Sequence, residues 1–117
     1  MINDKIKKII EENPVAFATS NNNIPNVIAI AYIKVVSDNE ILITDNYMNG
    51  SKENLLKNPN VCLAVWDRDW NGYKIIGTAQ YLTNGKWFDH IKELPENKDC
   101  PAKGAILVSV TEIRELS

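Results

Sequence analysis

The sequence has little of what enzymes use for chemistry of their own. Its 117 residues include one histidine and two cysteines. Cys62 and Cys100 share no metal-binding spacing such as C-x-x-C, so we interpret both as reduced thiols. His90 falls on an expected surface helix, where a histidine is more often solvated than catalytic. Without His90 no Ser-His-Asp set can be assembled, so a hydrolytic triad is not expected.

The chain also lacks a basic excess and long apolar runs. It has 13 Lys and Arg against 15 Asp and Glu, for a net charge of −2, which argues against nucleic-acid binding. The longest apolar stretch, residues 27–33, is far shorter than the ~20 residues of a membrane-spanning helix. The first residues show no signal-peptide pattern. We therefore expect a cytoplasmic single domain over residues 1–117, with neither membrane nor nucleic acid as partner.

Apolar periodicity divides the chain into short elements. Four isoleucines between residues 2 and 10 recur on one face of an amphipathic helix. Further helices are expected at residues 51–58 and 86–94. Strands are expected at residues 15–19, 26–36, 41–44, 61–66, 73–82 and 105–110, with a bulge or close backbone approach at Gly77.

These elements predict a mainly β fold, a six-stranded antiparallel barrel with short flanking helices. Residues 26–36 are apolar on both faces near their middle, so this strand is expected to be covered on both sides. A barrel of this size fills its interior with side chains. A sizeable ligand must therefore bind in an outer groove or at a subunit interface.

A candidate phosphate site lies where a strand leads through a polar loop into a helix. Gly50 lets the backbone approach an anion, Ser51 offers a hydroxyl, and Lys52 offers a charge. The free N–H groups of the first helical turn point to the same place. The alternative is that Ser51 only caps the helix and Lys52 is solvated. These residues alone leave both interpretations open.

Other candidate residues have simpler interpretations. Asp67 and Asp69 flank Arg68 and are better explained as a solvated turn than as an acid–base pair. Trp66, like the other two tryptophans, suits stacking on a planar ligand or packing in a core or interface. Since the side chains offer little chemistry, an enzyme of this sequence would depend on a cofactor.

Four motifs in order resemble the pyridoxamine 5′-phosphate oxidase-like FMN-binding split barrels. The first is Phe-Ala-Thr-Ser at residues 17–20, followed after a turn by Ile-Pro-Asn-Val. The second is Gly-Ser-Lys-Glu-Asn-Leu-Leu-Lys-Asn-Pro-Asn-Val at residues 50–61. The third is residues 73–81 with the following Thr-Asn-Gly turn, and the fourth is residues 101–108.

The resemblance implies a split β-barrel that binds FMN. It implies that Ser51 and Lys52 meet the FMN phosphate, while the remainder of the cofactor lies along two hairpin strands. The strand residues so implied are Ile28, Ala29, Ile30, Ile43 and Thr44. The family builds each site from two subunits, so a homodimer is implied, with Trp66 as a possible contribution from the partner. Many relatives keep a strand cation for the phosphate, and here the nearest such cation is Lys34.

The resulting hypothesis is an FMN-binding oxidoreductase or electron-transfer protein of unknown substrate and redox partner. The alternative is a flavin-carrying or ligand-sensing module without turnover. Vitamin B6 oxidation is not expected, because the basic C-terminal segment of the true oxidases is absent from this sequence. The residues do not separate FMN from a deazaflavin or heme.

Overall fold

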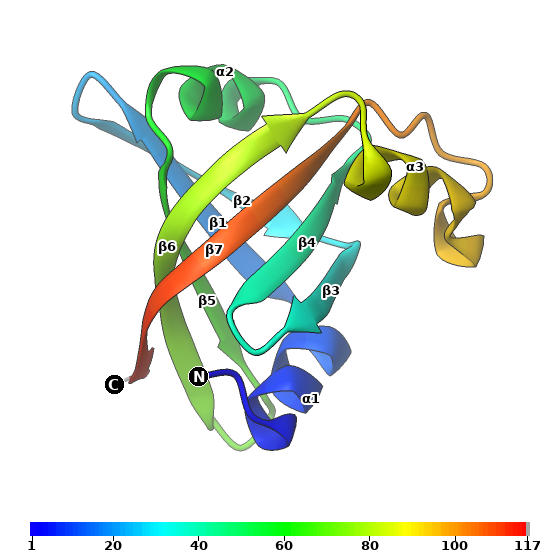
Figure 1. Cartoon of the computed structure of the whole chain (residues 1–117). Coiled ribbons are helices and arrows are strands. Elements are labelled where there is room, and N and C mark those ends of the chain that lie inside the picture. The colour runs from blue at the N-terminus through cyan, green and yellow to red at the C-terminus, as the bar shows by residue number, and fades with distance from the viewer. Residues whose placement is uncertain (117) are drawn as a thin grey trace.

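The structure, a computed structural model, describes residues 1–116 and consists mainly of β-strands (Figure 1). Its elements are α1 (Asp4–Glu12), β1 (Val15–Asn21), β2 (Ile24–Ile30), β3 (Ile33–Ser37), β4 (Glu40–Asp45), α2 (Gly50–Lys57), β5 (Asn60–Trp66), β6 (Gly72–Leu82), α3 (Lys86–Glu93), the 3-10 helix η1 (Pro95–Asn97) and β7 (Gly104–Glu115). The expectation of a mainly β domain with short helices is confirmed. None of the helices described in residues 1–116 has the length and apolar content to cross a bilayer.

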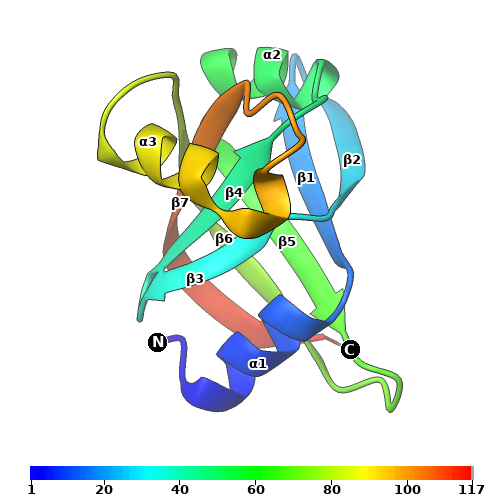
Figure 2. The same ribbon diagram turned by 90° about the vertical axis from the view of Figure 1, so that its right-hand side faces the viewer.

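The strands form one antiparallel sheet in the order β2-β1-β5-β6-β7-β4-β3. The prediction of six strands closed into a barrel is therefore wrong, because the sheet has seven strands and is open. The difference arises at Ala31 and Tyr32, which divide the expected strand 26–36 into β2 and β3. β2 pairs with β1 at one edge, and β3 pairs with β4 at the other. Because only two residues join these edge strands, the sheet must curl round on itself (Figure 2).

The outward face of β2 is bare, although its apolar residues predicted cover on both sides. Val27 is 65% exposed and Ala29 is also exposed, whereas Ile30 is buried. Successive residues of a strand point to opposite faces, and only one face of β2 lies against the core. In the single chain the outward face is therefore an uncovered apolar surface at this edge of the sheet, and cover of both faces stays a prediction.

The inward face of the curled sheet holds the main core. Alternate residues of the strands point inward, and Phe17, Leu63, Ile75 and Ile106 are completely buried there. Gly77 lets β6 and β7 bend over this core. The pairing register shifts at Gly77, and a Cβ atom there would collide with the carbonyl of Ser109. The expected bulge with close backbone approach is confirmed.

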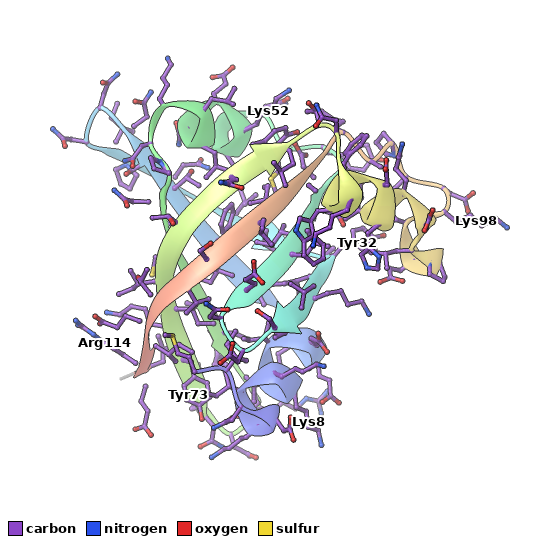
Figure 3. All side chains as sticks on the ribbon, viewed as in Figure 1. Lys8, Tyr32, Lys52, Tyr73, Lys98 and Arg114 are labelled. Atoms are coloured by element: carbon purple, nitrogen blue, oxygen red, sulfur yellow. The ribbon has the colours of Figure 1, made fainter. Side chains whose placement is uncertain are left out.

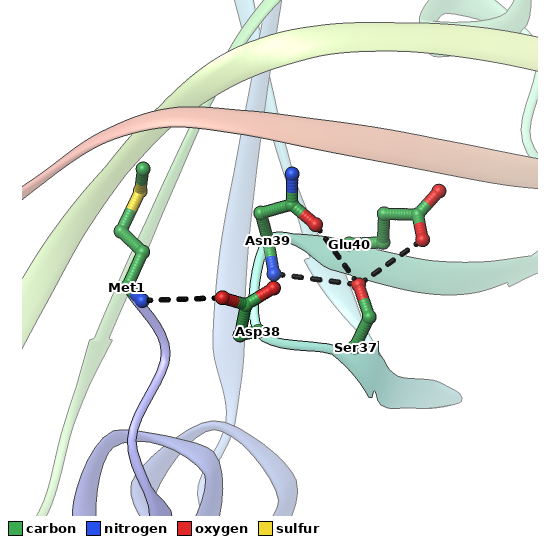
Figure 4. Close-up of polar contacts among 5 residues, drawn as sticks. All are labelled: Met1, Ser37, Asp38, Asn39 and Glu40. Carbon is green, nitrogen blue, oxygen red and sulfur yellow. Dashed lines mark hydrogen bonds and ion pairs between the residues drawn. The ribbon is translucent and has the colours of Figure 1, made fainter.

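Helix α1 covers one end of the sheet, opposite α2 and α3 (Figure 1). The isoleucines predicted from their spacing are all buried: Ile2, Ile6, Ile9 and Ile10. Asn3 starts this helix, since its Oδ1 accepts the N–H of Ile6 at 2.9 Å. The β3–β4 turn anchors the segment before α1. The Asp38 carbonyl accepts the N–H of Ile2 at 2.7 Å, and the Asp38 carboxylate lies 3.8 Å from the Met1 ammonium (Figure 4).

Candidate functional site

A cavity of about 350 Å³ lies between β2, the end of β4 and the start of α2. Four of its lining residues belong to residues 46–49, which join β4 to α2 and which we name the pocket loop. The cavity is lined by Asn26, Ile28, Ala29, Ile30, Ala31, Tyr32, Thr44, Asn46, Tyr47, Met48, Asn49, Gly50 and Ser51. It thus joins an apolar strip on β2 to polar groups at the start of α2.

The structure brings five of the sequence-predicted site residues together around this cavity. They are Ile28, Ala29, Ile30, Thr44 and Ser51. Ile43 is completely buried in the main core, because the alternation along β4 turns it away from Thr44. Trp66 and Lys52 do not line the cavity. Lys34 pairs instead with Glu96, at 3.5 Å between Nζ and Oε1.

The start of α2 differs from the expectation that Ser51 would be its first residue. The helix begins at Gly50, and Asn49 occupies the N-cap position without a side-chain cap bond. Ser51 is therefore the second helical residue, and its side chain is 1% exposed. Its Oγ accepts a hydrogen bond from Asn26 Nδ2 at 3.0 Å. The backbone N–H groups of this first turn are thus free of a side-chain cap and lie beside the Ser51–Asn26 pair.

Lys52 lies on the side of α2 that faces β6 (Figure 3). Its Nζ is 5.1 Å from the centroid of the Tyr81 ring, a cation–π distance. The Tyr81 hydroxyl donates to Asp45 Oδ2 at 2.5 Å. Burial, followed by this bond to the Asp45 carboxylate, raises the pKa of the Tyr81 phenol. No charged side chain is among the described residues that line the cavity.

Two tyrosines lie at the cavity that sequence reasoning did not select. Tyr47 is 74% exposed on the pocket loop, and Tyr32 lies between β2 and β3. A hydrogen bond with Cys100 is the main cause that raises the pKa of Tyr32. Sequence reasoning also missed the polar residues Asn26, Asn46 and Asn49. For Asn46 and Asn49 the available signal was their position in a loop, since loops often carry binding residues, whereas Asn26 lies within β2.

A second cavity of about 320 Å³ adjoins the first, with which it shares Ile28 and Ala29. Its lining is apolar apart from backbone atoms and includes Trp66. The rings of Trp66 and Trp70 are stacked, with centroids 6.5 Å apart and planes at 6°. Trp66 therefore closes an apolar groove that runs along the outside of β2.

The remaining candidates have structural explanations. His90 is exposed on α3, with its ring 6.3 Å from that of Trp87. Asp67 Oδ1 accepts the N–H groups of Asp69 and Asn71, at 2.9 and 3.0 Å, and so closes the β5–β6 turn. Within residues 1–116, no three His, Cys, Asp or Glu side chains gather as a metal site would require.

Comparison with known proteins supports a common family and fold. A family model described as pyridoxamine 5′-phosphate oxidase matches residues 2–117. An uncharacterized protein of Methanocaldococcus jannaschii is 33% identical over 120 residues, covering 98% of this chain and 80% of that protein. The structure of HupZ from Group A Streptococcus has a TM-score of 0.92 at 23% identity, over 99% of this chain and 94% of HupZ. An FMN-binding protein from Syntrophomonas wolfei has a TM-score of 0.81 at 17% identity, over 97% of this chain and 85% of that protein.

The two solved structures share too little sequence with this chain to show more than the fold, which is of the split-barrel type. The family match is stronger, because it extends over nearly the whole chain and agrees with the order of the four sequence motifs. The chain belongs to the pyridoxamine 5′-phosphate oxidase family.

Proposed function

We propose that this protein binds FMN in the 350 Å³ cavity and serves as an oxidoreductase or electron-transfer flavoprotein. The observation that carries the proposal is the position of the cavity, with the uncapped start of α2 at one end and the apolar strip of β2 at the other. FMN has the same division, with an anionic phosphate at one end and a flat ring at the other. When bound, FMN supplies hydride and single-electron transfer, and the protein orients it and excludes water.

The phosphate end would be held by neutral donors. The N–H groups at the start of α2 favour an anion through their partial positive charge. Ser51 Oγ and Asn26 Nδ2 lie beside them, 3.0 Å from each other, and both can turn a proton toward a phosphate oxygen. Lys52 would act from outside the cavity, as a charge near the helix start. This arrangement fits a phosphate without requiring a cation in the lining.

The ring end would lie along β2. Ile28, Ala29 and Ile30 supply an apolar strip, and Thr44 adds a hydroxyl from the neighbouring side of the cavity. Tyr32 and Tyr47 offer aromatic faces for an offset stack on a planar ring. Ile43 would act from the core, by supporting the strand that carries Thr44.

We propose further that the protein is a homodimer with FMN at the subunit interface. The outward faces of β2, β1 and β5 form two apolar rows in register, Ala29-Ala16-Ala64 and Val27-Ala18-Cys62. Burial raises the pKa of the Cys62 thiol even in the single chain. A two-fold contact through these rows would bury them and would bring Trp66 of each subunit toward the site of the other. Light scattering at micromolar concentration tests this, and a monomer that binds FMN tightly would contradict it.

One observation supports the second candidate, a flavin carrier or ligand sensor without turnover. The described residues that line the cavity include no histidine, carboxylate, lysine or cysteine, which are the side chains that most often transfer protons in catalysis. Stopped-flow reduction of the FMN-loaded protein by NADH and NADPH separates the two. Saturable reduction at roughly 10 per second or faster would indicate a dedicated reductase. Slow reduction by both would favour the carrier or a one-electron role.

Titration of the apo protein with FMN and riboflavin tests the proposal itself. Each charge-assisted hydrogen bond to the phosphate is worth about 1.5–3 kcal/mol, so FMN should bind at least about tenfold more tightly. Bound FMN would also appear directly in the visible spectrum of the purified protein. Equal affinity for the two flavins would remove the phosphate site, and no binding of either would remove the proposed function.

A further inference from the structure

One segment outside the cavity, residues 95–103, makes hydrogen bonds to both the nitrogen and the oxygen of the Asn46 side-chain amide. Asn46 Nδ2 donates to Asn97 Oδ1 at 2.8 Å. Asn46 Oδ1 accepts the N–H of Ala102 at 2.9 Å. Asn46 lines the cavity, whereas Asn97 and Ala102 do not. The orientation of this amide is therefore set from behind the cavity wall.

The same segment contacts two more cavity residues. Lys103 Nζ donates to the Met48 carbonyl at 3.0 Å, and Cys100 Sγ lies 3.8 Å from the Tyr32 hydroxyl. Figure 2 shows the segment, in yellow to orange, passing between the end of β4 and the connection from β2 to β3. It thus lies against the pocket loop and against the far end of the cavity.

The central contact in this arrangement is the buried pair of amides. Asn46 is 5% exposed and Asn97 is 2% exposed. Asn97 is fixed in turn, because its Nδ2 donates to the Ile91 carbonyl at 3.3 Å. Ala102 adopts a left-handed backbone conformation, with φ of 48°, in the position from which its N–H reaches Asn46. A non-glycine residue pays a steric cost in that conformation, so the surrounding contacts must over-determine it.

We propose that Asn97 is a positioning residue for the ligand cavity. Asn97 does not line the cavity itself, but it fixes the Asn46 amide, and through it the pocket loop, in the geometry that receives the ligand. This inference rests on the proposed function, since the ligand is taken to be FMN. Preorganisation of a loop raises affinity because the bound conformation no longer has to be selected from many.

The first test compares Asn97→Ala with Lys98→Ala by FMN titration of the full chain. Lys98 is the next residue, is exposed, and projects away from the body of the molecule (Figure 3). Asn97→Ala should weaken FMN binding about tenfold, which corresponds to about 1.4 kcal/mol. Lys98→Ala should bind FMN as the unchanged protein does. Unchanged affinity in Asn97→Ala would overturn the proposal.

A double-mutant cycle separates positioning from general destabilisation. If Asn97 acts through Asn46, then in an Asn46→Ala background the further change Asn97→Ala should leave FMN affinity as it is. Thermal stability should still fall, because the bond from Asn97 to the Ile91 carbonyl is lost in either background. An equal loss of FMN affinity in both backgrounds would show that Asn97 has only a structural role.

Amide hydrogen exchange of the apo protein keeps this inference distinct from the proposed function. The N–H of Met48, which donates to Asp45 Oδ1 at 2.7 Å, should exchange faster in Asn97→Ala. The N–H of Trp70, in the remote β5–β6 turn, should exchange as before. Unchanged exchange at Met48 would overturn the positioning role whether or not FMN binds. Faster exchange at Met48 in a protein that binds no FMN would support positioning and remove FMN as the ligand.

Discussion

Two loops of similar length in this molecule are held in opposite ways. The β5–β6 turn, residues 67–71, is held by its own first residue, since Asp67 Oδ1 accepts two N–H groups of the turn. The pocket loop is held mainly from far along the chain. Besides a local bond, from the Met48 N–H to Asp45 Oδ1, the loop and the preceding Asp45 are bonded to Tyr81, Asn97, Ala102 and Lys103, at separations of 36 to 58 residues.

The difference connects stability with function. The β5–β6 turn keeps Trp70 in a left-handed conformation, φ 64°, yet depends only on neighbours in sequence. The pocket loop depends on the assembled sheet and on the segment before β7. A change in the turn should therefore stay local, whereas a change behind the pocket loop should reach the ligand cavity. Four substitutions test this contrast.

The largest effect is expected for Tyr81→Phe. The Asp45 carboxylate is 0% exposed and receives the Tyr81 hydroxyl at 2.5 Å. Loss of a hydrogen bond to a buried charged group should lower the free energy of unfolding by about 2 kcal/mol. FMN affinity should fall with it, because Asp45 also accepts the N–H of Met48. Urea unfolding measures the free energy of unfolding, and titration measures FMN affinity. A variant of unchanged stability with weakened FMN binding would show that the bond serves the pocket loop alone.

The same substitution should change the response to alkaline pH. The pKa of Tyr81 is raised in the folded state, so its stabilising effect is complete below its ordinary value of about 10. That effect is lost as the pH rises further, because the unfolded chain then gives up the proton more readily. Tyr81→Phe should therefore lose less of its free energy of unfolding at alkaline pH than the unchanged protein does. Unfolding followed between about pH 8 and pH 11 checks it.

The contrast between the loops also explains what the sequence could and could not predict about the fold. The spacing of four isoleucines gave α1, because a helix face is a local pattern. The division of residues 26–36 into β2 and β3 was missed. Both halves are apolar and β-branched, and the break at Ala31 and Tyr32 depends on pairing with β1 and with β4. Strand pairing of that kind leaves no mark in the local pattern.

The candidate site residues divide in the same way, into those marked by a local motif and those that only the folded chain brings together. Ser51 was selected because a Gly-Ser-Lys at a helix start is a local motif, and the structure places it at the cavity. Asn46 and Asn97 were not selected, since nothing in their sequence surroundings marks a pair 51 residues apart. Ile43 was selected with Thr44 from the same strand, but alternation sends the two side chains to opposite faces.

The next effect in size is expected for Ser51→Ala. FMN binding should weaken about tenfold, the effect of one lost hydrogen bond of about 1.4 kcal/mol, while riboflavin binding should stay the same. Ser20→Ala is a matched control. Ser20 Oγ accepts the amide of Asn58 at 3.1 Å, as Ser51 Oγ accepts that of Asn26, but it lies outside the cavity lining. Equal FMN affinities of the two variants would deny Ser51 a role in phosphate binding.

A smaller effect is expected for Asp67→Ala. The β5–β6 turn should lose the acceptor that closes it, at a cost of about 1 kcal/mol in the free energy of unfolding. The stack of Trp70 on Trp66 should loosen, which tryptophan fluorescence reports. FMN affinity of the single chain should not change. A loss of FMN affinity that is the same at every protein concentration would show that this turn is coupled to the cavity. The contrast between the two loops would then be wrong.

The smallest effect is expected for Lys52→Ala, which tests whether charge outside the cavity assists binding. Its cation–π contact with Tyr81 is partly exposed, so the free energy of unfolding should fall by only about 0.5 kcal/mol. FMN should bind about two- to threefold more weakly at low salt and equally well at high salt, because a screened charge contributes little. Lys57→Ala, an exposed lysine at the other end of α2, is the control and should show neither effect. If Lys52→Ala matches Lys57→Ala at low salt, the phosphate is held by neutral groups alone. The helix start, Ser51 and Asn26 would then account for the whole preference for FMN over riboflavin.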